Sequence, residues 1–428
     1  MTESIKFAEA AQDKARIGAP SILGFTEEGE SLVPAEAKAG ALGGAAAKGH
    51  SHGGGFGVPD SSRAGRLASY RLEDFPEVKG NEEEWRFTPL KRFGGLHAVA
   101  LDGAAPAVAV DAPEQVRVEA VGRDDSRVGS AATPEDRASA NAWAHFGEAT
   151  VVTLPAGVEL DAPVRIQQTG TGSVPAAAHV VVIAEAGARG VVVLGHEGEA
   201  VVSENVEVVL EDGAELTLVS LQEWDDTAVH ASSQQVRIGR DAKLKHIVVS
   251  LGGGVVRMTP TARFAAPGGE AELYGLYFAD AGQHLEHRTF VDHAQPNCVS
   301  NVLYKGALQG KEARTVWVGD VLIRKEAEGT DSYEKNQNLV LTDGCRADSV
   351  PNLEIETGLI EGAGHASATG RFDDDHLFYL MARGIPEDVA RRLVVRGFLN
   401  EIIQKIGVPA IEEHLTEAVE RELAAGDN

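Results

Sequence analysis

Short β-branched runs separated by turn residues recur along residues 146–370, and this repetition constrains the fold more than any other feature. Each run spans four to eight residues and ends at Gly, Pro, Asp or Asn. The runs include ATVVTL, APVRI, HVVVIA, GVVVLG, VEVVLE, LTLVSL, QVRIG and LKHIVVSL. Turn phrases recur at Gly187, Gly213 and Gly239, each 26 residues after the last, and at Gly268 after another 29. A fixed period of this size is typical of a solenoid.

The solenoid that short apolar strands favour is a parallel β-helix, in which each coil stacks its inward residues on the preceding coil. A β-sandwich also contains many short strands. It would not readily repeat one turn phrase over so long a stretch. We therefore predict a mainly β protein with a parallel β-helix over residues 146–372.

Four other segments flank the predicted β-helix. Residues 1–34 are expected to be a helical segment, and residues 35–66 a flexible Gly/Ala-rich linker. Residues 67–145 form a mixed region in which Trp85 and Phe87 are the aromatic anchors of a docking segment. Residues 373–428 have helical periodicity and are predicted to form a C-terminal helical domain.

Composition and charge exclude several classes of protein. The formal net charge of −26 argues against nucleic-acid binding. No apolar run of about 18 residues predicts a membrane span, and the N-terminal residues lack the apolar core of a signal peptide, so we expect a cytoplasmic protein. Cys298 and Cys345, the two cysteines of the chain, are predicted to be free thiols of a reducing compartment. The phrase GALQGKEA lacks the spacing of a phosphate loop, which excludes an ATP site there.

Three groups of side chains are candidates for chemistry. His284, His287 and His293 lie near Cys298, but His284 and His287 would point to opposite faces of a strand, which favours packing over metal binding. Cys345 follows Asp-Gly at a predicted turn, where its thiol is either reachable or a small buried apolar group. The small neighbours of His365 leave room for its imidazole and let another backbone approach closely. A packed histidine in the last coil is the alternative.

A β-helix is also compatible with a carbohydrate-active lyase or hydrolase, in which carboxylates line a groove. The candidate carboxylates are Asp280, Glu286, Asp292 and Asp320. Solvated surface is the simpler explanation for acidic residues, and the expected lack of an export signal argues against a polymeric substrate.

Four phrases resemble the SufB/SufD family of iron–sulfur cluster assembly proteins. They are EEWRFTPL at 83–90, VVTLPAGVELDAPVRI at 151–166, QNLVLTDGCRADSVPNLEIE at 337–356, and HASATGRFDDDHLFYLMARGIPEDVARRLVVRGFL at 365–399. Ala366 follows the histidine where SufB would carry glutamate, which favours the SufD branch of the family. The resemblance implies a right-handed β-helix flanked by helical regions, and a non-enzymatic scaffold role.

The resemblance also implies partners and a site. The last coils would pair with SufB, or with a second copy when the chain is isolated, and the C-terminal helices would dock the ATPase SufC through the apolar stripe from Val389 to Ile403. A transient iron–sulfur cluster, shared with SufB, would form at the paired coils. His365 matches the histidine that the family places there, and Cys345 falls where SufB carries its assembly cysteine, so both are predicted cluster and metal ligands.

Two further expectations depend on the same resemblance. Some members carry a cysteine two residues before the histidine, but this chain has Ala363 there, so a Cys-x-His pair is absent. The family's complexes are associated with a reduced flavin. A purely structural SufC-docking protein, without a ligand role, is the alternative within the family.

Overall fold

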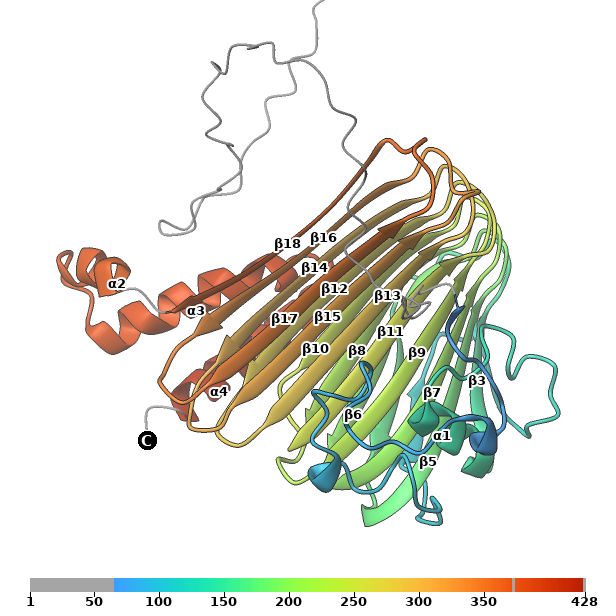
Figure 1. Ribbon diagram of the computed structural model, residues 1–428, viewed down its shortest axis with the longest axis horizontal. Coiled ribbons are helices and arrows are strands. Elements are labelled where there is room, and N and C mark those ends of the chain that lie inside the picture. Colours follow the sequence, from blue (N-terminus) through green and yellow to red (C-terminus); the bar gives the residue numbers. More distant parts are fainter. Residues whose placement is uncertain (1–64, 372–373, 426–428) are drawn as a thin grey trace, which may run out of the picture. The chain divides into compact units, whose positions relative to one another are not determined.

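The computed structural model describes residues 65–371 and 374–425 (Figure 1). The predicted helical segment 1–34 and nearly all of the predicted linker lie outside the described residues. The chain divides into two units, Met1–Gly55 with Asp373–Ala390, and Phe56–Phe372 with Arg391–Asn428. In the first unit the described elements are α2 (Asp374–Met381) and the beginning of α3 (Glu387–Ile403). All contacts described below lie within the second unit.

Two nine-stranded sheets form the second unit, and the chain alternates between them (Figure 1). Sheet A contains β1 (Ala107–Asp111), β4 (Val164–Thr169), β6 (Arg189–Gly198), β8 (Glu215–Trp224), β10 (Lys243–Ser250), β12 (Glu270–Ala279), β14 (Val299–Leu308), β16 (Asp331–Val340) and β18 (Gly362–Arg371). Sheet B contains β2 (Arg117–Val121), β3 (Ala149–Leu154), β5 (Gly172–Ala184), β7 (Ala200–Leu210), β9 (Val229–Ile238), β11 (Val255–Phe264), β13 (His284–His293), β15 (Arg314–Ile323) and β17 (Arg346–Ile355).

From β3 to β18 every neighbouring pair of strands is parallel, and each coil gives one strand to each sheet. These strands make about eight coils of a β-solenoid. Buried side chains of both sheets meet between them in one apolar cluster that extends from Val152 to Ala327. The predicted mainly β architecture with a parallel β-helix is therefore confirmed.

One corner of the solenoid shows why the turn phrases repeat. Residues with positive φ form a column there, and the backbone N–H of Gly187 donates to the carbonyl of Asp212 on the next coil at 3.0 Å. The column consists of Gly157, Gly187, Gly213, Asp241, Gly268, Asn297 and Gly329. The predicted marker Gly239 is wrong by two residues, because Asp241 holds the left-handed position with φ 51°. Aspartate and asparagine tolerate this conformation better than other residues with a side chain.

The strands are longer than predicted. Most of them span ten residues, because polar inward-facing residues continue each strand beyond its apolar run. Hydrogen bonds between these residues make burial acceptable. Gln234 Nε2 donates to Ser220 Oγ at 2.9 Å, and Gln234 Oε1 lies 2.7 Å from His246 Nε2. The interior between β8, β9 and β10 is therefore polar along part of each strand.

The region before the solenoid covers its first coil and the outer face of sheet B. Strands β1 and β2 pair antiparallel with β4 and β3. Helix α1 (Arg137–His145) begins at a capping box of Asp136 and Ser139, and accepts a hydrogen bond from Ser203 at the Ala138 carbonyl, 2.9 Å. Two 3-10 helices, Leu72–Asp74 and Leu90–Arg92, lie in the same region.

The predicted docking segment docks on the chain's own solenoid. The Trp85 side chain is buried, and the guanidinium of Arg257 on β11 lies 4.2 Å from the centre of the indole ring. Thr88 Oγ1 donates to Glu286 Oε2 on β13 at 2.8 Å. The aromatic anchor at Trp85 is thus part of the fold.

From Arg391 onward, α3 and α4 (Pro409–Ala425) pack on the outer face of sheet A. Lys305 Nζ on β14 donates to the Phe398 carbonyl at 3.1 Å and pairs with Glu401 at 2.5 Å. Within the predicted apolar stripe, residues from Phe398 onward are buried, whereas the side chains of Val389 and Leu393 are exposed. None of the described helices combines the length and apolarity needed to span a bilayer.

Candidate functional site

The two ends of the solenoid differ. At the first coil, β1 and β2 close the sheets with antiparallel pairing. At the last coil, β17 and β18 are the terminal strands of their sheets, and among the described residues no strand pairs with their outer edges. Unpaired strands of ten residues present rows of free N–H and C=O groups, which another β protein can pair with. The last coil is therefore an open end.

His365 lies inside this open end. It pairs in register with Glu334 on β16, so both side chains point to the same face of sheet A, toward the interior. No coil follows β18, and the His365 side chain is 43% exposed, whereas that of Glu334 is 1% exposed. His365 Nδ1 lies 3.7 Å from Glu334 Oε1. An imidazole and a carboxyl group thus meet at the opening.

The Glu334 carboxyl group is in an unusual state. Burial raises its pKa to about 8, the charge of Asp320 adds to this effect, and the backbone of Asn352 opposes it. Neither of its oxygens makes a hydrogen bond of good geometry, and Trp317 Nε1 is likewise buried without one. Gly319 makes room for both side chains, since a Cβ there would collide with the Trp317 ring and with Glu334 Oε2. A cation at the opening would favour the ionised carboxylate.

Cys345 lies at the other end of the same coil. It is half-buried in the turn between β16 and β17, where its Sγ lies 3.2 Å from the Gly310 carbonyl and 3.4 Å from Thr342 Oγ1. Six strand residues, or roughly 20 Å at about 3.3 Å per residue, separate His365 from the end of β18 near this turn. The structure therefore brings His365 together with Glu334 and keeps Cys345 apart.

Glu334 was missed from the sequence alone. The alternation in DSYEKNQNLV marks one face with Ser332, Glu334, Asn336 and Asn338, but polar residues on a face are normally taken as solvent-exposed. Only the register between β16 and β18 reveals that this face is interior and that His365 lies beside it.

The histidines near Cys298 do not converge. His284 and His287 point to opposite faces of β13, as predicted. His284 Nε2 lies 3.3 Å from Glu286 Oε2 on the outer face, whereas His287 stacks on Tyr277 in the interior, with ring centres 4.8 Å apart. Cys298 is buried and not in a disulfide. These residues serve packing and hydrogen bonding.

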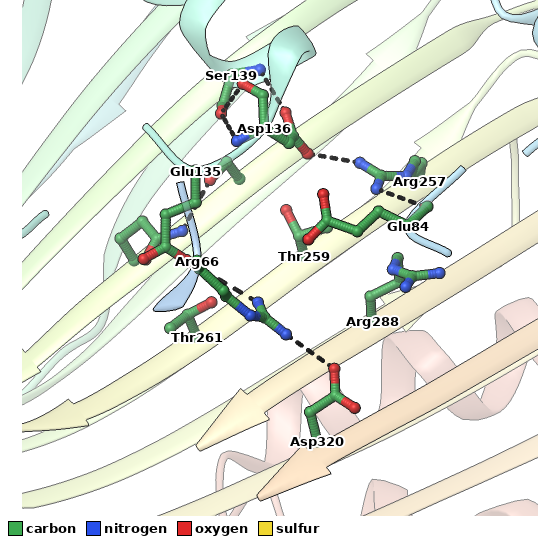
Figure 2. Close-up of a pocket in the computed structure, with 12 residues that line it drawn as sticks. Arg66, Glu84, Glu135, Asp136, Ser139, Arg257, Thr259, Thr261, Arg288 and Asp320 are labelled. Atoms are coloured by element: carbon green, nitrogen blue, oxygen red, sulfur yellow. Dashed lines mark hydrogen bonds and ion pairs between the residues drawn. The ribbon is translucent and has the colours of Figure 1, made fainter. Parts of the chain in front are cut away.

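A small polar pocket of about 30 Å³ lies on the outer face of sheet B, and Figure 2 shows the residues that line it. Its charged groups pair with one another: Arg66 Nη2 lies 2.8 Å from Asp320 Oδ2, and Arg257 Nη1 lies 2.7 Å from Asp136 Oδ2 (Figure 2). These ion pairs join the N-terminal region and α1 to the solenoid.

The carboxylates considered for a lyase are largely engaged in the same way. Glu286 is fully buried between Arg257 and Arg288, and both oxygens of Asp292 accept from Arg324. With Asp320 also paired, three of the four candidates lie in ion pairs instead of an open groove.

The fold and the open end define the class of protein: a parallel β-solenoid with one closed end, one open end that carries an imidazole and a carboxyl group, and helices packed on its outer face. A family model described as "SUF system FeS cluster assembly, SufBD core domain" matches residues 165–398, more than half of the chain. The chain belongs to this SufBD family of iron–sulfur cluster assembly proteins.

Relatives with this family name share most of the chain. Iron-sulfur cluster assembly SufBD family protein Rv1462 of Mycobacterium tuberculosis is 54% identical over 369 residues, which cover 83% of this chain and 92% of the relative. The ML0594 protein of Mycobacterium leprae is 52% identical over 373 residues, covering 84% and 94%. A second M. leprae protein of the family, ML0593, is 26% identical over 261 residues, covering 60% of this chain and 30% of that protein.

Proposed function

We propose that this chain is a SufD-type scaffold subunit of cytoplasmic iron–sulfur cluster assembly, without catalytic activity of its own. Its open end would pair with a SufB-type partner through the free edges of β17 and β18, and the nascent cluster would be held there as cargo. The observation that carries this proposal is the placement of His365 and buried Glu334 at the unpaired end of the solenoid.

The ligands of this chain suit iron. Imidazole and carboxylate are both common iron ligands, and a metal that binds Glu334 would displace its proton. His365 and Glu334 would act together, while Cys345, roughly 20 Å away along the strand, would contribute a thiolate at a separate point of the same interface. The partner would supply the remaining ligands.

A partner from the same family is consistent with the comparisons. M. leprae has one family member that is 52% identical to this chain and another that is only 26% identical. Two divergent members of the family in one organism are what a pair of different subunits requires. In the absence of the partner, the same edges would pair two copies of this chain.

The C-terminal helices carry the proposed SufC-binding surface. Large apolar side chains of α2 and of the beginning of α3 are exposed, at Phe378, Tyr379, Met381 and Val389, and Leu393 is exposed further along α3. Exposed apolar groups of this kind are typical of protein–protein interfaces. ATP hydrolysis by SufC would then move the helices and, through α3, the coils of the open end. The reduced flavin would belong to the assembled complex, and no residue of this chain is assigned to it.

Co-expression with SufB and SufC tests the proposal. We expect His365→Ala and Glu334→Gln to reduce the cluster absorbance of the purified complex without loss of either partner. His414→Ala is the matched control, because His414 pairs with Glu223 on the surface far from the open end. Unchanged cluster yield in His365→Ala would remove that residue from the site.

Two further measurements separate the alternatives. Normal cluster yield in a Cys345→Ser, His365→Ala double variant would support a purely structural SufC-docking role. Light scattering of the isolated chain should give the mass of a dimer, and a charge placed on the edge, Ala368→Glu on β18, should give a monomer. A monomeric wild-type chain that also fails to bind SufB would contradict edge pairing.

A further inference from the structure

Three side chains inside the early coils have no role in the proposed cluster site. His196 lies two residues before the end of β6, Glu204 is the fifth residue of β7, and His230 is the second residue of β9, one coil further on. The side chains of all three are at most 1% exposed. They occupy the polar side of the solenoid interior, where strands of the two sheets meet.

The three groups are arranged as metal ligands are. One ligand atom of each lies within 4.8 Å of the other two. His196 Nε2 lies 3.3 Å from Glu204 Oε2, and His230 Nε2 lies 3.4 Å from the same oxygen. A tetrahedral site with metal–ligand bonds of about 2.1 Å has ligand atoms about 3.4 Å apart. Both measured separations match this distance between two ligand atoms.

The surrounding hydrogen bonds orient the ligand side chains. His196 Nδ1 lies 2.9 Å from the Leu221 carbonyl, which can only accept, so Nδ1 carries a proton and Nε2 is the ring nitrogen that faces Glu204. Ser232 Oγ donates to Glu204 Oε2 at 2.9 Å, and Gln168 Nε2 donates to Oε1. Partners of this kind orient ligands in known metal sites.

His230 has a choice of tautomer. Its Nδ1 lies 2.9 Å from Gln222 Oε1 and 3.0 Å from the indole N–H of Trp224, which can only donate. Its Nε2 is buried and makes no hydrogen bond of good geometry. A metal ion at Nε2 selects the tautomer in which Nδ1–H donates to Gln222, and the Trp224 N–H then loses its acceptor. Metal binding would therefore change the hydrogen bonding of the Trp224 indole.

Glu204 differs in its partners from Glu286 and Asp292, two other buried carboxylates. Buried Glu286 and Asp292 pair with arginines. Among the described residues no arginine or lysine forms an ion pair with Glu204. A divalent ion would place a positive charge next to this carboxylate.

We propose that His196, Glu204 and His230 bind one divalent transition-metal ion, Zn²⁺ or Fe²⁺, inside the solenoid. Two imidazoles and a carboxylate are a ligand set that both ions accept. The ion would link two consecutive crossings from sheet A to sheet B, β6 to β7 and β8 to β9, and so connect neighbouring coils. The site is independent of the open end, because it lies on β6, β7 and β9 and not on β16 to β18.

The burial of the site determines how it is tested. An ion so enclosed enters during folding, so the full chain is expressed in medium supplemented with Zn²⁺ or, anaerobically, with Fe²⁺. After dialysis against EDTA, metal is quantified by mass spectrometry. We expect about one ion per chain, retained through dialysis and released on denaturation. The arm with the higher occupancy identifies the ion.

Glu204→Gln and His230→Gln should each lower occupancy at least tenfold. His246→Gln is the matched control, because His246 is equally buried and bonds Gln234 instead. If a variant fails to fold by circular dichroism, Co²⁺ loading of the refolded wild type provides a second measurement. Tetrahedral visible absorption and a change in tryptophan fluorescence that is absent from Trp224→Phe are then expected. A metal-free wild type in both arms, or equal occupancy in Glu204→Gln, would overturn the proposal.

Discussion

The Glu334→Gln substitution tests the electrostatics of the open end most directly. The pKa of the Glu334 carboxyl group rises from its ordinary value of 4.5 to about 8 in the folded chain, chiefly because it is buried. The folded chain therefore holds this proton more tightly than the unfolded chain does. The stability that the proton provides is complete below pH 4.5, declines as the pH rises to about 8, and is absent above that.

The size of the effect follows from these two values. A carboxyl pKa that rises from 4.5 to about 8 on folding lowers stability by up to about 5 kcal/mol above pH 8, since each unit corresponds to about 1.4 kcal/mol. Glutamine keeps the shape of the side chain and carries no charge. We therefore expect Glu334→Gln to be more stable than the wild type at pH 8.5, and the difference to vanish near pH 4.5.

Urea denaturation at fixed protein concentration, followed by circular dichroism at both pH values, measures this difference. Glu199→Gln, at an exposed position, is the control and should change nothing. A Glu334→Gln variant that is no more stable than the wild type at pH 8.5 would refute the assigned protonation state. If the open end takes up iron, Fe²⁺ added at pH 8.5 should stabilise the wild type and leave the variant unchanged.

Three further predictions concern packing and docking. Gly319→Ala should lose about 1–3 kcal/mol of stability in urea denaturation, because its Cβ collides with Trp317 and Glu334, while Gly358→Ala, in open space, should be neutral. Arg257→Met should cost about 3–5 kcal/mol by leaving Glu286 and Asp136 short of a cation, and should speed proteolysis of the segment around Trp85. The matched substitution at an exposed arginine, Arg240→Met, should change neither the stability nor the rate of proteolysis. Leu393→Asp should change stability by less than about 0.5 kcal/mol yet prevent co-purification with SufC, and retained SufC would argue against this docking surface.

The repeat could be recognised in the sequence because conformational preferences of single residues produce it. Each coil needs a residue with positive φ at the same corner, and glycine provides it at Gly187, Gly213 and Gly268. The corner residue of the next coil after Gly213 could not be identified from sequence. Asp241 adopts the positive φ there, and glycine merely adopts this conformation more easily. The strands were predicted too short for a related reason. Gln234 and His246 form a hydrogen bond across the interior, so the strands continue through these polar residues.

The β-solenoid, the C-terminal helices and the place of His365 in the last coil could all be predicted from the order of residues. Periodicity, turn residues and helix-breaking residues act over a few positions, so they can be read along the chain. Which polar groups meet in the interior became clear from the stacking of the coils. His365 with Glu334, 31 residues earlier, and Glu204 between His196 and His230 are brought together by the register of stacked coils. Coil lengths set that register, and they change from one coil to the next as their turns change.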